Sequence, residues 1–167
     1  HYPLLKKIAK TKKPIIISTG MATKKEIQMA LKTLYQYGAK KIILLRCNST
    51  YPAPIEESNL MTIRDMSKIF KVNIGLSDHT IGSLNAISAI ALGATVIEKH
   101  VTISKNDGGL DSIFSLEIKN FKKFVEDCRN TKKIIGKVYY GPSKREKPSL
   151  KYRRSIYVSK NIKKGEK

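Results

Sequence analysis

The sequence has 167 residues, 41% of them apolar, so it is long enough to bury the core of one domain of ordinary size. Its 33 basic and 13 acidic residues give a net charge of +20, and no apolar run approaches the roughly 20 residues of a membrane-spanning helix. The two cysteines, Cys47 and Cys128, are too few and too widely spaced for a disulfide framework or a structural zinc site, which favours a cytoplasmic location.

The positive charge bears directly on function. Strongly basic proteins often bind nucleic acid, so a basic nucleic-acid-binding module is one interpretation of this sequence. Proteins of that kind gather Lys and Arg on one face, with aromatic residues between them. Here the lysines are spread along the whole chain, so we interpret them as the solvated faces of several helices. We expect neither nucleic acid nor a membrane as a partner.

After an opening stretch of helical character, the chain contains four short apolar runs rich in β-branched residues. This pattern is typical of parallel strands that are covered on both faces. The predicted strands span residues 14–18, 41–46, 72–77 and 94–100.

Helices are predicted between and after these strands. Thr23 and Glu26 form a capping-box pattern that opens a helix, and Gly38 ends it. Further helices are predicted at 59–70, at 83–92, and from Ser115 or Leu116 to the residue before Gly136.

Strands and helices in alternation predict an α/β fold with parallel strands joined by right-handed crossovers. A doubly wound sheet and half of a (β/α)8 TIM-type barrel both satisfy this pattern. The GxGxxG motif of nucleotide-binding sheets follows none of the four strands, so we favour the barrel.

Polar residues follow each predicted strand at its carboxyl end, where ligands bind in both architectures. Side chains alternate along a strand, so Ser77 and His79 share one side, and Glu98 and His100 share one side. Two imidazoles near a carboxylate suit a divalent metal ion, and two structural histidines that bond to backbone carbonyls are an equally good interpretation.

The hydroxyl groups at the strand ends allow two interpretations as well. Ser18, Ser49 and Ser77 could hold a phosphate or carboxylate, or they could cap the helices that follow. Cys47 has no histidine in a recognisable relation to it, so we interpret it as a buried core residue and not as a nucleophile.

Five motifs in this order resemble the sialic acid synthase family, which makes nine-carbon nonulosonic acids. The resemblance extends from about Pro14 to Gly165. The motifs are KPIIISTGMAT (13–23), CNSTYPAP (47–54), GLSDHT (75–80), ALGATVIEKHVT (91–102) and DGGLDSIFSLE (107–117).

The resemblance implies a (β/α)8 barrel followed by a small antifreeze-like domain, which caps the barrel of the partner in a domain-swapped homodimer. Residues 1–145 would then be the C-terminal half of the barrel, and 146–167 a linker and the start of the antifreeze-like domain. Residues 155–158 would be the first strand of that domain. Because half of the barrel would lie outside these 167 residues, we expect them to be inactive alone.

The resemblance also implies a reaction and its site. Family members condense phosphoenolpyruvate with an open-chain 2-acetamido sugar aldehyde and release phosphate, and they use a divalent ion, here Mn²⁺ or Mg²⁺. His79 and His100 would bind the metal, and Glu98 and Asp111 would lie beside the reacting centre and the sugar. Substrate-binding residues would be Ser18, Ser49, Tyr51, Ser77 and Ser112.

Within the family, the forms of the YPAP and DGGLDSIFSLE motifs look more like pseudaminic acid synthases than N-acetylneuraminate or legionaminate synthases. That branch implies a 2,4-diacetamido-2,4,6-trideoxy hexose as acceptor. Leu110 stands where proline is usual and Asn48 where threonine is usual. A metal-dependent barrel aldolase with another acceptor is a further alternative, which phosphate release from phosphoenolpyruvate would exclude.

Overall fold

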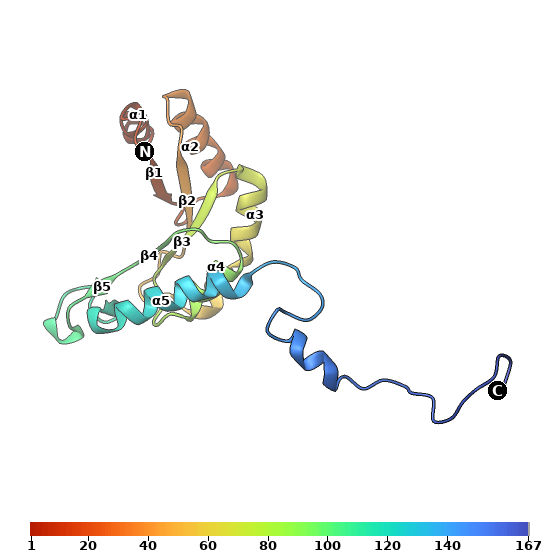
Figure 1. Ribbon diagram of the computed structural model, residues 1–167. Helices are drawn as coiled ribbons and strands as arrows, with labels where there is room; N and C mark the ends of the chain where they lie inside the picture. Colours follow the sequence, from red (N-terminus) through yellow and green to blue (C-terminus); the bar gives the residue numbers. More distant parts are fainter. Residues whose placement is uncertain (167) are drawn as a thin grey trace. The chain divides into compact units, whose positions relative to one another are not determined.

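The computed structural model describes residues 1–166, which divide into two units, 1–136 and 137 onward. The first unit contains the helices and strands that carry the site (Figure 1). They are α1 (Tyr2–Lys10), β1 (Ile15–Ser18), α2 (Lys24–Gln36), β2 (Ile42–Cys47), α3 (Met61–Phe70), β3 (Asn73–Asp78), α4 (Leu84–Ala91), β4 (Ile97–Lys99), β5 (Val101–Thr102), β6 (Leu116–Glu117) and α5 (Ile118–Ile135).

Strands β1 to β4 form one sheet in sequence order, and every neighbouring pair is parallel. This order confirms the four strands expected from the apolar runs. Helix α2 starts as its sequence predicts: the Thr23 hydroxyl accepts a hydrogen bond from the Glu26 backbone N–H, and the Glu26 carboxylate accepts from the Thr23 backbone N–H at 2.7 Å. These bonds satisfy two backbone donors that the first helical turn leaves open.

The helices and the sheet share one apolar core. Leu34 of α2, Ile63 of α3 and Ala89 of α4 all pack against strand residues such as Leu44 and Ile74. On β1 the neighbouring Ile16 faces the opposite side and is 54% exposed. Helices therefore cover one face of the sheet, as on the outside of a barrel, whereas a doubly wound sheet carries helices on both faces.

Strand β4 leaves the sheet after three residues. The chain continues past His100 into β5, which pairs in parallel with β6. Leu116 and Glu117 were expected in the first turn of a helix; they form β6 instead, and α5 begins at Ile118. The physical reason is that Val101 and Thr102 offer them a hydrogen-bonding edge, and two paired residues are too few to show a strand period in the sequence.

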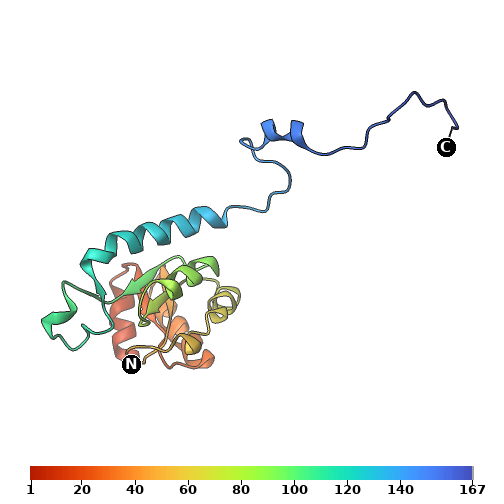
Figure 2. The same cartoon turned by 90° about the horizontal axis from the view of Figure 1, so that it is seen from below.

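Helix α5, cyan in Figure 2, contacts α4. Among residues 1–166, no helix combines the length and the apolar character needed to cross a membrane.

From 137 onward the described chain has one short 3-10 helix, Lys147–Tyr152. Residues 155–158, expected as a strand, carry none in the structure. A strand needs a hydrogen-bonded partner, and residues 137–166 supply no second strand.

Candidate active site at the carboxyl end of the sheet

The strand register brings three polar side chains into one row. Cys47 of β2 pairs with Ser77 of β3, and Ser77 pairs with Glu98 of β4. The Ser77 hydroxyl, in a residue that is 3% exposed, donates a hydrogen bond of 2.6 Å to Glu98 Oε1. This row lies on the face opposite the helices, because Leu76 and Ile97 on either side of it contact the apolar core.

His79 follows directly after β3 and is 6% exposed. Its Nδ1 lies 2.6 Å from the backbone carbonyl oxygen of Asn48, which can only accept, so Nδ1 carries the hydrogen. Its Nε2 lies 3.4 Å from the Ser77 hydroxyl, whose single hydrogen is already donated to Glu98. The Nε2 atom therefore presents a free electron pair.

His100 lies between β4 and β5, and its ring centroid is 5.2 Å from that of His79. Alternation along the two strands predicted that these side chains would share one face, and the structure has them side by side. The Asp111 carboxylate approaches Nδ1 of His100 at 3.3 Å. This contact favours the tautomer with the hydrogen on Nδ1, so that Nε2 of His100 also presents a free electron pair.

The two imidazoles fit a divalent metal ion by their chemistry. In protein metal sites a ligating histidine usually donates its other ring N–H to a carbonyl or carboxylate, as His79 does to Asn48 and as the contact with Asp111 favours for His100. Among residues 1–166, no group of three or more His, Cys, Asp and Glu side chains lies close enough together to hold a metal ion. The described residues thus offer two donors, and a metal ion remains a prediction.

Aromatic rings pack around the two histidines. The Tyr51 ring lies 4.2 Å from that of His79 and 5.9 Å from that of His100, centroid to centroid. Phe114, which is 6% exposed, lies 5.0 Å from His100 and 5.5 Å from Tyr51. The sequence interpretation did not name Phe114, because a lone phenylalanine in a polar loop gives no signal of its neighbours.

The loop before β6 carries Asp111 and Ser112, both expected at the sugar. Asp111 is exposed and reaches His100, whereas Ser112 is 6% exposed and its backbone N–H donates to the carbonyl of Gly109 at 3.0 Å. A Cβ atom on Gly109 would lie 2.9 Å from the Ser112 hydroxyl oxygen. Glycine at this position therefore leaves room for the serine side chain.

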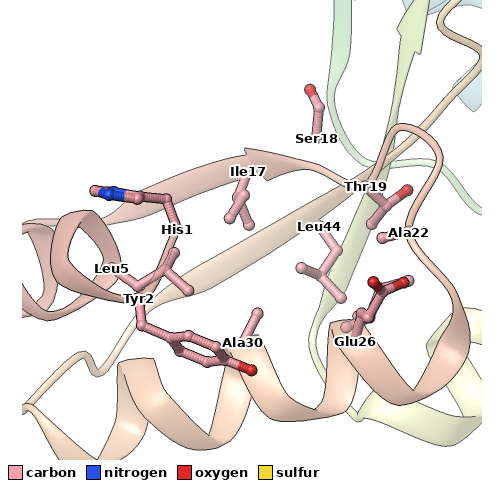
Figure 3. Close-up of a pocket in the computed structure, with 11 residues that line it drawn as sticks. His1, Tyr2, Leu5, Ile17, Ser18, Thr19, Ala22, Glu26, Ala30 and Leu44 are labelled. Carbon is pink, nitrogen blue, oxygen red and sulfur yellow. The ribbon is translucent and has the colours of Figure 1, made fainter.

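Ser18 and Ser49 are less closely tied to the two histidines. Ser18 aligns with Leu45 in the register, two residues before Cys47, and lies beside a cavity of about 310 Å³ between α1, α2 and β1. Figure 3 shows its hydroxyl directed away from Leu44. Ser49 is exposed, and its hydroxyl oxygen lies 4.0 Å from the sulfur of Cys47.

Cys47 is 4% exposed, in agreement with its interpretation as a buried residue. Its sulfur nevertheless lies 4.0 Å from Nδ1 of His79, so it forms part of the wall behind that ring. The other cysteine, Cys128 on α5, lies outside this site, and its burial raises the pKa of the thiol above its usual value.

The chain is similar in sequence to two proteins that are named as nonulosonic acid synthases. The chain is 45% identical to an N,N'-diacetyllegionaminic acid synthase of Campylobacter jejuni over 99% of this chain and 51% of the relative. It is 42% identical to a pseudaminic acid synthase of Helicobacter pylori over 98% of this chain and 48% of the relative. The chain thus spans about half the length of the curated relatives that it matches.

The fold has a solved counterpart. A crystal structure of N-acetylneuraminic acid synthetase from Leptospira borgpetersenii, 32% identical, superposes with a TM-score of 0.81 over 92% of this chain and 54% of that protein. Together with the one-sided helix layer, this likeness confirms the predicted half-barrel. The model of the NeuB family matches residues 1–140, and with relatives above 40% identity along almost all of its length the chain belongs to the NeuB family.

Proposed function

We propose that this chain carries one half of the active site of a nonulosonic acid synthase, an enzyme that joins phosphoenolpyruvate to an acetamido sugar aldehyde and releases phosphate. The observation that carries the proposal is the joint position of Ser77, Glu98, His79 and His100 on one face at the carboxyl end of the sheet. Relatives with synthase names support it.

In this proposal the residues of the chain bind and orient the two substrates. Ser77 lies at a strand end suited to phosphoenolpyruvate, and its hydroxyl would turn its hydrogen from Glu98 to the phosphate or carboxylate when that substrate binds. Ser49 lies nearer the loop. The Glu98 carboxylate is a candidate to accept a proton from the water that adds to the enol-derived carbon. The rings of Tyr51 and Phe114 pack against the imidazoles and would help to keep water from one side of them once the substrates are bound.

A divalent ion, when bound by Nε2 of His79 and Nε2 of His100, would stabilise the negative charge that develops on the aldehyde oxygen, an effect of several kcal/mol. Mn²⁺ and Mg²⁺ are the candidates. In this arrangement each histidine would direct the N–H of Nδ1 toward Asn48 or Asp111 respectively and would offer the electron pair of Nε2 to the ion.

For the acceptor we propose a 2,4-diacetamido-2,4,6-trideoxy hexose of the pseudaminic type. The relatives include legionaminic and pseudaminic acid synthases at 45% and 42% identity, so overall identity does not choose between them. The proposal relies on the DGGLDSIFSLE loop, where Asp111 lies beside His100 and offers acceptors to an acetamido N–H. A native domain-swapped homodimer is proposed on the family resemblance alone.

The test is a phosphate-release assay on the native full-length protein with phosphoenolpyruvate, Mn²⁺ and one acceptor at a time. We expect turnover with the diacetamido sugar and poor turnover with N-acetylmannosamine, because the latter lacks the second acetamido group and would leave the polar atoms that bond that group unpaired. Equal turnover of the two sugars would refute the pseudaminic acceptor. If phosphate were released with none of the three acceptors, namely the diacetamido sugar, N-acetylmannosamine and a legionaminic-type sugar, the synthase proposal would be refuted.

Ser77→Ala should raise the apparent KM for phosphoenolpyruvate about tenfold or more, because it removes a buried hydroxyl that donates to Glu98 at 2.6 Å and leaves that carboxylate less well held. Steady-state kinetics at saturating sugar measure it. Ser143→Ala, an exposed serine in the second unit, is the matched control and should leave this KM unchanged. An unaltered KM in Ser77→Ala would remove Ser77 from the substrate site.

A further inference from the structure

An ion pair lies behind the proposed site, on the helix side of the sheet. Lys99 Nζ lies 2.7 Å from Asp78 Oδ2, and the two side chains are 3% and 0% exposed. Charged side chains are almost never buried to this degree unless they are paired. Taking both from water carries a large desolvation penalty, and an apolar pair of similar volume often gives equal or greater stability. A gain in folding stability is therefore a weak explanation for why Lys99 and Asp78 are buried together.

Its position points to another role. Asp78 and Lys99 are the last paired residues of β3 and β4, and the next residue along each strand is His79 and His100. Side chains alternate across a sheet, so each charge lies on the helix side and each imidazole on the opposite side. The ion pair thus sits directly behind the two histidines.

Beyond that position the two strands separate. The carbonyl of His79 accepts a hydrogen bond from the backbone N–H of Ala53 at 3.0 Å, and the carbonyl of His100 accepts from that of Leu116 at 2.9 Å. The two histidine backbones are thus held by different segments of the chain. The distance between the two histidines therefore depends on the contacts that join β3 to β4 at the point where the strands separate, which we call the fork.

Lys99 makes that connection on both sides of His79. Its ammonium group donates to Asp78 Oδ2 and also to the backbone carbonyl of Thr80, each at 2.7 Å. Asp78 Oδ1 accepts from the Thr80 backbone N–H at 3.1 Å, from the Thr80 hydroxyl at 2.8 Å and from Asn85 Nδ2 at 2.8 Å. Every carboxylate oxygen is satisfied, and the turn after His79 is tied to α4.

We propose that Lys99 and Asp78 are positioning residues that set the distance and orientation between the imidazoles of His79 and His100. Lys99 precedes His100 in the chain and binds both residues that flank His79, so any movement of one histidine backbone is passed to the other. An apolar pair would fill the same volume without directional bonds to Thr80. This role concerns the same site as the proposed function, and ring geometry tests it independently.

The experiment uses the double variant Asp78→Asn with Lys99→Met in the native full-length protein. It removes both charges and the bonds from Lys99, while the new amide oxygen can still accept from Thr80 and Asn85. It also avoids the single variants, in which one buried charge without a partner can prevent folding. Leu34→Ala, a fully buried core position far from the fork in sequence, is the control for general destabilisation.

The readout is the nuclear Overhauser cross-peak between the two imidazoles in protein with ¹³C-labelled histidine, assigned with His79→Gln and His100→Gln. Parent and Leu34→Ala protein should show the cross-peak, and the double variant should lose it. The melting temperature of the double variant should nevertheless fall less below that of the parent than the melting temperature of Leu34→Ala does. The rate of phosphate release should also fall at least about tenfold, since displacements near 1 Å can lower rates about 100-fold.

A cross-peak of parent intensity in the folded double variant would overturn the positioning role. So would its loss in Leu34→Ala, because that result would make the geometry a consequence of overall stability. The cross-peak requires neither substrate nor metal. Absence of phosphate release in the parent would therefore count against the proposed function alone.

Discussion

His100→Gln should lower kcat/KM for phosphate release by about 100-fold or more in the native full-length protein. Glutamine keeps a polar side chain of similar length but cannot offer the Nε2 electron pair that we assign to a divalent ion, whose effect on the developing charge is several kcal/mol. The His100 side chain is 34% exposed, so its replacement should change folding stability little.

His1→Gln is the matched control, because His1 is exposed and, although it lines the cavity beside Ser18, it is not among the rings that pack around His79 and His100. Assays across a series of Mn²⁺ concentrations separate metal binding from later steps: a lost ligand should raise the Mn²⁺ concentration needed for half-maximal rate. If His100→Gln kept activity within about threefold of the parent at every Mn²⁺ concentration, the metal-ligand assignment would be wrong.

Gly75→Ala should lower the free energy of unfolding by about 2–3 kcal/mol. Gly75 lies within β3, where a Cβ atom would meet the carbonyl oxygen of Val96 at 2.4 Å and a methyl carbon of Leu45 at 2.6 Å. The carbonyl oxygen of Val96, directly before β4, accepts a hydrogen bond from the backbone N–H of Leu76 at 2.9 Å and is not free to rotate away. The segments must therefore separate to admit the methyl group.

Urea denaturation monitored by circular dichroism measures this change. Gly109→Ala is the matched control, because the atom nearest to its new methyl group is the hydroxyl of Ser112, at the end of a side chain that can rotate. We expect a smaller loss there. Equal losses at the two positions would contradict the claim that contact with the neighbouring strand requires glycine at position 75.

The four strands and the side-chain alternation could be derived from the sequence, because both are local properties. A buried parallel strand needs a continuous apolar run, and residues two apart on a strand share a face wherever the strand lies. The shared face of Ser77 with His79, and of Glu98 with His100, follows from spacing alone. The ordered motifs then indicated the family, which the family match confirms.

Other features were decided by tertiary structure, since they depend on residues far apart in the chain. Strand β6 forms because Val101 and Thr102 offer a pairing edge. The hydrogen on Nδ1 of His79 is set by the carbonyl of Asn48, a backbone group that has no sequence signal. Phe114 reaches His100 only after the loop folds back.

Lys99 illustrates the same limit. In sequence it is one of 33 basic residues, and an average lysine lies on a solvated surface. The register of β3 and β4 instead places it opposite Asp78, where helix α4 and the sheet exclude water from both charges. Local pattern determined which face each residue occupies, whereas only the assembled strands decided which charges are buried together, because burial and pairing are properties of neighbours that the chain brings together by folding.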